Sequence, residues 1–232
     1  MNTVEFYEKN GYAILKNAIP ETLINQYEKL WLDHHSQNGQ ILNYHGWTSS
    51  SSYMNHKEIL DILCHENIFN FLKLLNNNIV LHLSFTSWVS TRKAWHQDWT
   101  KADKQGANNY FGVWVALDKI DPNSGPFQFI PGSHNWDIDY NLIYDKSNKD
   151  QVSNLLIQES LKREALAYSF LPDKGDLIIW NGHLIHRGSD PVDENILRKS
   201  IIGHYGIING NIVSHKTGFY HSDKSSAIDL YK

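Results

Sequence analysis

Three short stretches of this chain carry residues that could do chemistry. The first is Trp95-His96-Gln97-Asp98, in which His96 and Asp98 are two positions apart. In an extended strand such positions share one side, so an imidazole and a carboxylate can meet at one point. The second stretch, 176–186, reads as a strand that ends in two histidines, His183 and His186. The third begins at Arg198 and opens another strand.

Two imidazoles and one carboxylate on one face of an iron ion are the ligands of non-haem Fe(II) oxygenases. The three open positions can take a chelating 2-oxo acid and O₂. A nearby arginine, here Arg198, can pair with the far carboxylate of that acid. His183 and His186 compete for one ligand position, because side chains three apart face opposite sides of a strand. The apolar Leu184-Ile185 pair and the distance to Arg198 favour His186.

The composition sets the frame for such a site. The chain has 232 residues, of which 41% are hydrophobic and 20% charged, and a formal charge of −4, values that are ordinary for a soluble globular protein. The slight acidity argues against a nucleic acid partner. We find no signal-peptide pattern and no apolar run of membrane-spanning length, so a cytoplasmic protein without membrane contact is expected. The single cysteine, Cys64, excludes an internal disulfide.

The elements that must position the site follow from periodicity. Helices are expected after Pro20, over 57–75 and over 150–165. Strands are expected over 11–16, 79–89, 110–117, 127–130, 176–180 and 200–208, with turn residues between them. Several short strands without βα units favour an antiparallel sandwich or barrel. We expect one domain over 1–232, with a helical layer over about 1–77 and a β core over about 78–208.

In this order the motifs resemble the phytanoyl-CoA dioxygenase family of Fe(II)/2-oxoglutarate-dependent oxygenases. The resemblance implies a mainly β fold with some α, namely a double-stranded β-helix (a cupin-like jelly roll) with N-terminal helices packed on one sheet. It runs from Gly11 to about Tyr205. The motifs that carry it are 95–98, Trp114 within 113–117, the stretch 125–134, Gly175-Asp-Leu, Leu184-Ile-His186 and Leu197-Arg198-Lys-Ser200.

The resemblance also implies roles for single residues. His96, Asp98 and His186 would be the catalytic ligands of Fe(2+). The co-substrate 2-oxoglutarate would contact Arg198, Ser200, Gln97 and Trp114, with Ser189 and Ser84 as further candidates. Gly188 is interchangeable with Ser189, because the segment between His186 and Arg198 is about one residue longer here than in relatives.

The expected function is therefore hydroxylation of an unactivated C–H bond of a small-molecule metabolite, using O₂ and releasing succinate and CO2. An acyl-CoA is not expected, because no basic cluster suits its nucleotide phosphates; the aromatic residues around the motif are compatible with an amphipathic or cationic metabolite. A non-redox, cupin-like metal or ligand-binding jelly roll, or a hydrolytic zinc site, is the alternative. The retained carboxylate of Asp98 argues against a halogenase.

Three further features keep two interpretations each. Trp95 and Trp99 are either core residues or walls of the pocket. His134 either caps a turn or touches the substrate. Gly132 is expected to supply the backbone angles of that turn. The run Ser49–Ser52 is either a plain loop or a cover over the mouth of the pocket.

Overall fold

The N-terminal part of the protein is helical, as the sequence predicts. The computed structural model describes residues 2–36, 43–47, 52–98, 109–143, 145, 147–207 and 224. The helix predicted over 57–75 is in fact two helices: α3 ends before Cys64, and α4 begins after His65, whose Nδ1 accepts a hydrogen bond from the N–H of Asn67 (3.3 Å). Side-chain capping of this kind satisfies a free N–H group at a helix start. The α-helices in the described residues of this part are α1 (Thr3–Asn10), α2 (Glu21–His35), α3 (Lys57–Leu63) and α4 (Glu66–Leu75).

Two antiparallel sheets form the centre of the molecule. The larger sheet has the strand order β1-β6-β3-β8-β2, and the smaller one β5-β4-β7. Each pair of neighbouring strands is antiparallel, which confirms the predicted jelly-roll class. The strands are β1 (Tyr12–Leu15), β2 (Ile79–Ser87), β3 (Tyr110–Ala116), β4 (Phe127–Phe129), β5 (Tyr168–Ser169), β6 (Leu177–Asn181), β7 (His186–Gly188) and β8 (Ser200–Ile207).

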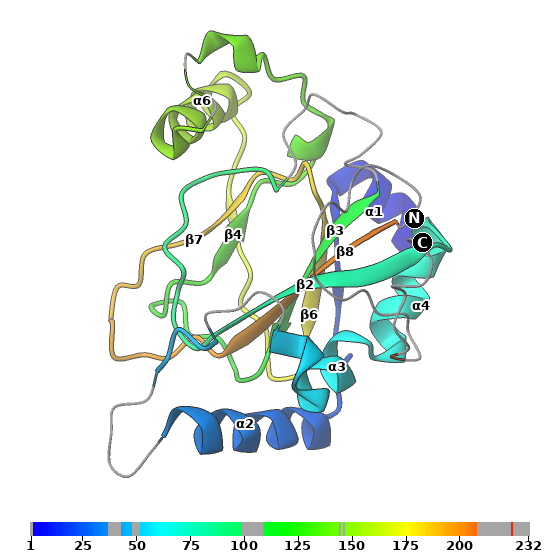
Figure 1. Ribbon diagram of the computed structural model, residues 1–232. Helices are drawn as coiled ribbons and strands as arrows, with labels where there is room; N and C mark the ends of the chain where they lie inside the picture. Colours follow the sequence, from blue (N-terminus) through cyan, green and yellow to red (C-terminus); the bar gives the residue numbers. More distant parts are fainter. Residues whose placement is uncertain are drawn as a thin grey trace.

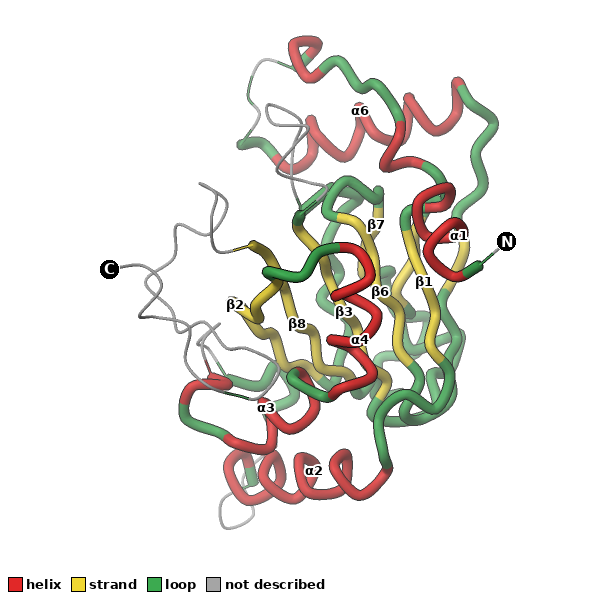
Figure 2. Tube along the Cα trace, turned by 90° about the vertical axis from the view of Figure 1, so that its right-hand side faces the viewer, coloured by secondary structure: helices red, strands yellow, loops and turns green. Residues whose placement is uncertain are grey.

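The larger sheet is buried on both faces. Its outer face packs on the N-terminal helices: α4 crosses that face, with α2 and α3 at one end (Figure 2). Its inner face meets the smaller sheet (Figure 1). Trp114, Trp180 and Phe127 belong to one buried apolar cluster. Every residue of the central strands β3 and β6 is buried, which explains why both strands are mainly apolar rather than alternating.

The segment between β4 and β6 closes one end of the smaller sheet. It contains two short 3-10 turns, Ser133–Asn135 and Tyr140–Leu142, and helix α6 (Lys149–Lys162). Residues of α6 such as Leu156 pack with Ile130 and Ile185 in a separate apolar cluster. Gly132 has φ +76°, as expected for the turn at this place. Within the described residues, no helix combines the length and hydrophobicity that crossing a membrane requires.

The stretch 176–186 differs from its prediction as one strand. β6 ends at Asn181, and His186 begins β7 in the other sheet. The change of sheet occurs at a turn in which the Asn181 side chain accepts the His183 N–H (2.9 Å) and the Asn181 carbonyl accepts the Leu184 N–H (2.8 Å). The chain therefore carries His186 from one sheet to the other.

Candidate metal centre

Three predicted ligands meet at one point between the two sheets. The Nε2 atoms of His96 and His186 each lie 3.6 Å from Oδ1 of Asp98. Ligand atoms of all three residues lie within 4.8 Å of one another, and no other such group of three or more His, Cys, Asp or Glu side chains exists among the described residues. Metal bonds of about 2.0–2.2 Å to nitrogen and oxygen place two ligands within about 4.4 Å. The cluster therefore fits a metal ion.

The backbone orients both imidazoles. Nδ1 of His96 lies 2.8 Å from the carbonyl oxygen of Ala94, and Nδ1 of His186 lies 2.9 Å from that of Leu184. Because a carbonyl only accepts, each Nδ1 carries the proton and each Nε2 keeps its lone pair for a metal. The two residues also form an isolated antiparallel bridge, with reciprocal N–H to carbonyl hydrogen bonds of 3.1 and 3.0 Å.

Trp180 fixes the carboxylate. Its indole Nε1 donates a hydrogen bond to Oδ2 of Asp98 (2.9 Å), so Oδ1 is the oxygen that faces the imidazoles. The indole lies over Gly112 of the neighbouring strand β3, where an added Cβ would lie 2.0 Å from the ring. Gly112 thus provides the space for the residue that orients Asp98.

The charges suit metal binding at neutral pH. Burial lowers the pKa of His186 to about 3, so its imidazole is neutral. Burial alone would raise the pKa of Asp98, but the imidazoles around it outweigh that effect and hold this pKa well below its usual value. A neutral imidazole and an ionised carboxylate are the forms that bind a cation.

Arg198 is buried in the same cavity without an acidic partner. Its side chain is 2% exposed, and its two terminal nitrogens donate to the carbonyl oxygens of Gly125 (3.1 Å) and Val89 (3.3 Å). Nε has no hydrogen-bond partner, and no carboxylate of the described residues lies within ion-pair distance. Burial lowers the pKa of Arg198 to about 10, which leaves it cationic at neutral pH. A buried cation of this kind calls for an anionic ligand.

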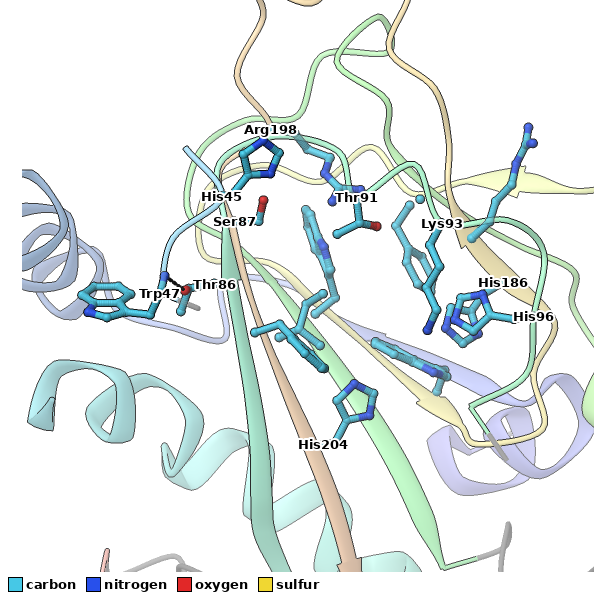
Figure 3. A pocket seen from close by; sticks show the side chains of 17 residues that line it. His45, Trp47, Thr86, Ser87, Thr91, Lys93, His96, His186, Arg198 and His204 are labelled. Atoms are coloured by element: carbon cyan, nitrogen blue, oxygen red, sulfur yellow. Dashed lines mark hydrogen bonds between the residues drawn. The ribbon is translucent and has the colours of Figure 1, made fainter. Parts of the chain in front are cut away.

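The cavity joins the arginine to the metal ligands. Its volume is about 460 Å³, and Arg198, Trp114, His96 and His186 all line it (Figure 3). Trp114 is fully buried, its ring centroid lies 5.9 Å from the guanidinium carbon of Arg198, and its Nε1 has no hydrogen-bond partner. Two orphaned donors, Nε1 of Trp114 and Nε of Arg198, fit the carboxylate of a 2-oxo acid.

The other predicted co-substrate contacts have polar groups that are engaged elsewhere. Oγ of Ser200 donates to the Ser87 carbonyl (3.2 Å), and Oγ of Ser189 donates to that of Pro126 (2.8 Å). Ser84 lies 3.3 Å from the Ser52 hydroxyl. These three serines do not line the cavity, and Gly188 does. Their contacts with 2-oxoglutarate stay predictions.

Gln97 faces away from the metal ligands and ties the surrounding loops together. Its Nε2 donates to the carbonyl of His183 (2.5 Å), and its Oε1 accepts a hydrogen bond from the Tyr140 hydroxyl. The side chain of Gln97 lines a smaller cavity on the far side of the metal stretch. The structure thus shows a positioning network around Gln97, and its contact with the co-substrate stays a prediction.

The structure resolves the open alternatives where it describes them. His186 joins the metal cluster, and His183 does not. His134 lies 3.0 Å from the Glu8 carbonyl through Nε2, at the turn beside α1, which favours its structural role. Trp95 lines the smaller cavity and stacks on Arg187 at 4.7 Å. Trp99 and residues 49–51 lie outside the described residues.

Several cavity residues escaped the sequence analysis, and His204 is one of them. His204 is 6% exposed and its Nδ1 has no hydrogen-bond partner in the structure. Alternation along β8 could have found it, because positions 198, 200, 202 and 204 share one side of an extended chain. Trp180 and Lys93 also line the cavity, and no spacing rule singles them out.

Solved structures of other proteins share this fold. The carbocyclase SnoK, described as non-haem and alpha-ketoglutarate-dependent, superimposes with a TM-score of 0.68 at 15% identity, over 88% of this chain and 83% of that one. The epimerase SnoN, solved in complex with Fe3+, alpha-ketoglutarate and nogalamycin RO, gives a TM-score of 0.65 at 16% identity, over 88% and 82%. The fold is that of 2-oxoglutarate-dependent oxygenases.

Sequence comparison gives the family. The model of the phytanoyl-CoA dioxygenase (PhyH) family matches residues 7–192, and the chain belongs to this family of 2-oxoglutarate-dependent oxygenases. The expectation of iron, 2-oxoglutarate and O₂ as cofactors is confirmed at the level of the family. The matched residues include the three candidate ligands and end before Arg198.

Curated relatives agree with this assignment. Phytanoyl-CoA dioxygenase domain-containing protein 1 of Danio rerio is 26% identical over 126 residues, which cover 53% of this chain and 43% of that protein. Peroxisomal phytanoyl-CoA dioxygenase of Bos taurus is 21% identical over 98% of this chain and 74% of its own length. The first match thus spans less than half of the relative.

Proposed function

We propose that the protein hydroxylates an unactivated C–H bond of a small molecule, with 2-oxoglutarate and O₂ as co-substrates. In this proposal His96, Asp98 and His186 hold Fe(II), and Arg198 binds the distal carboxylate of 2-oxoglutarate. The observation that carries it is the buried guanidinium of Arg198, which has no acid among the described residues and shares a cavity with the metal cluster. A protein that only binds a metal would not need this cation, whereas a 2-oxo acid supplies the anion that it lacks.

Iron bound there, together with 2-oxoglutarate and O₂, supplies the oxidising power to insert one oxygen atom into the C–H bond while 2-oxoglutarate becomes succinate and CO2. The chain supplies orientation and exclusion of water. The Ala94 and Leu184 carbonyls hold both imidazoles in the metal-binding tautomer, and Trp180 holds Asp98. Arg198 and Trp114 donate to the co-substrate, which sets its direction in the cavity.

The apolar walls favour a hydrocarbon part of the substrate beside the metal. Phe85, Ile202, Phe127 and Trp180 line the cavity between β8 and the smaller sheet. Such walls exclude water and leave the substrate as the nearest oxidisable group. Because structural neighbours include a carbocyclase and an epimerase, the oxidative outcome needs its own measurement.

The test is succinate formation from 2-oxoglutarate by the iron-loaded protein, with a library of small metabolites as substrates. We expect succinate to require Fe(II) and O₂, and the product to gain one oxygen atom by mass spectrometry. No succinate under any condition would refute the oxygenase. A product that loses two hydrogens or keeps its mass would refute hydroxylation and leave the oxygenase class intact.

A further inference from the structure

A second cation lines the cavity close to the metal ligands. Lys93 lies three residues before His96, is exposed to solvent, and borders both the main cavity and the smaller one behind it. Figure 3 shows its side chain extending toward His96 and His186. The ammonium group thus faces the reaction centre.

Lys93 has no partner among the described residues. No hydrogen bond or ion pair within 4.0 Å joins its ammonium to them. The Asp98 carboxylate at the same centre is engaged: its Oδ2 accepts from Trp180 and its Oδ1 faces the imidazoles. An ammonium group and a metal cation repel each other, and an anion bound between or beside them would relieve that repulsion.

The other cations around this cavity are occupied. Arg198 serves the distal carboxylate of 2-oxoglutarate under the proposed function. Nε of Arg187 donates to Gln128 (2.8 Å), and its guanidinium stacks on Trp95. Arg92, the neighbour of Lys93, pairs with Glu194 at 2.8 Å outside the cavity. Among these four cations, Lys93 is the one without an assigned partner in the described residues.

From this arrangement we infer that Lys93 binds a carboxylate of the substrate, which would make the substrate an organic acid with an apolar body. The inference rests on the proposed function, because it uses the same cavity. A single ammonium is a point charge that suits one carboxylate, whereas a phosphate group usually calls for several donors. The neighbouring wall of Phe85, Ile202 and Phe127 receives the apolar body. A cationic metabolite, which the aromatic composition alone allows, would face repulsion from Lys93 and Arg198.

Matched acids and amides test the inference by binding rather than by turnover. The probes are hexanoate, octanoate and 4-phenylbutyrate, each paired with its primary amide. Dissociation constants come from tryptophan fluorescence under nitrogen, in protein loaded with Fe(II) and saturated with 2-oxoglutarate so that Arg198 is occupied; Trp114 and Trp180 line the cavity and report on its contents. We expect at least one acid to bind about tenfold more tightly than its amide, the usual advantage of a charge-assisted hydrogen bond.

Three variants decide whether Lys93 causes the preference. Lys93→Met should bring the acid-to-amide ratio close to one, and Lys93→Arg should keep most of it. Arg92→Met removes one positive charge from the adjacent position outside the cavity and should leave the ratio unchanged. Circular dichroism and a second neutral variant, Lys93→Gln, control for misfolding.

Several results would overturn the inference. These are amides that bind as tightly as acids in the wild-type protein, a Lys93→Met protein that keeps the acid preference, and a loss of 2-oxoglutarate affinity in Lys93→Met as large as the loss for the acid. The last result would place the ammonium on the co-substrate. Failure of the proposed function is separate: it would show as absence of succinate formation in the wild-type protein, while the binding ratio would still decide the role of Lys93.

Discussion

Histidines gather at two places in this molecule, and their surroundings differ. His96 and His186 direct Nε2 at one carboxylate oxygen, and backbone carbonyls hold their Nδ1 atoms. The second group, here called the Trp47 histidines, consists of His34, His35 and His56. Their rings surround the indole of Trp47 at centroid distances of 5.4, 4.6 and 4.9 Å.

The Trp47 histidines lack what makes the first group a ligand set. They pack ring against ring, with His34 and His56 at 5.0 Å, and they do not form a candidate metal group within the described residues. The number of histidines is therefore a poor signal for a metal site. A shared carboxylate and a hydrogen bond on the opposite ring nitrogen distinguish the candidate metal ligands.

Loss of a ligand should have the largest effect. Asp98→Ala or His186→Ala should lower iron affinity by more than about 100-fold, the upper end for loss of a supporting hydrogen bond alone, and should abolish succinate formation. Iron content by elemental analysis and a succinate assay measure both effects. The triple variant His34→Gln, His35→Gln, His56→Gln is the matched control and should keep bound iron. Iron loss in the triple variant would show that the Trp47 histidines also contribute to iron binding.

Removal of the proposed co-substrate anchor, Arg198, should change the KM for 2-oxoglutarate rather than the affinity for iron. Arg198→Ala deletes one partner of a buried charge pair, at a cost of about 2–5 kcal/mol, so the KM for 2-oxoglutarate should rise roughly 30-fold or more. Arg198→Lys should rescue it only in part, because an ammonium cannot form the paired fork. Iron content should stay unchanged in both variants. Near-normal 2-oxoglutarate dependence in Arg198→Ala would assign the anchor to another residue.

The hydrogen bond to the carboxylate should contribute less than a ligand. Trp180→Phe removes the donor to Oδ2 of Asp98 and should lower metal affinity about 10-fold, the lower end for residues that support a ligand. Titration with Co(II), followed by its absorption spectrum, measures this loss. Trp31→Phe, in the buried core on the helical side, controls for the loss of an indole. Equal metal affinities in the two variants would show that Trp180 does not support the metal site.

The Trp47 histidines should make the free energy of unfolding depend on pH. Burial, and then the neighbouring histidines, lower the pKa values of His35 and His56 below 6.5. Below about pH 6.5 the unfolded chain therefore binds more protons than the folded chain. The free energy of unfolding decreases as the pH is lowered. In chelator-treated protein, the free energy of unfolding should drop between about pH 7.5 and pH 5.5. The double variant His35→Gln, His56→Gln should drop less, and an identical drop would exclude these two residues as its cause.

The sequence predicts the strands better than the connections between them. β1, β2, β3, β4, β6 and β8 fall where alternation and β-branched residues indicate them. The break at Cys64-His65 is invisible to periodicity, because apolar spacing continues across it and only the His65 side chain marks the new start. The sequence does not predict β7 either. This strand has only three residues, too few for a pattern, and its pairing with β4 identifies it as a strand.

The three residues of the candidate metal centre were predictable from the order of the motifs, whereas their neighbours in space were not. Gly112 shows the limit: a glycine in a strand signals a close approach, but the residue that approaches, Trp180, lies on another strand. Lys93 is a surface-type residue by composition, and only the folded chain places its ammonium beside the metal cluster. Residues that act through three-dimensional neighbours thus require the structure.

The reciprocal backbone bridge between His96 and His186 has a consequence for how the centre fills. Two main-chain hydrogen bonds set the separation of the imidazoles, so folding alone brings these two ligands together. Little conformational entropy is then left to lose when an ion enters. Loading should follow simple bimolecular kinetics, without a slow rearrangement after encounter, and one divalent ion should replace another without refolding of the sheets.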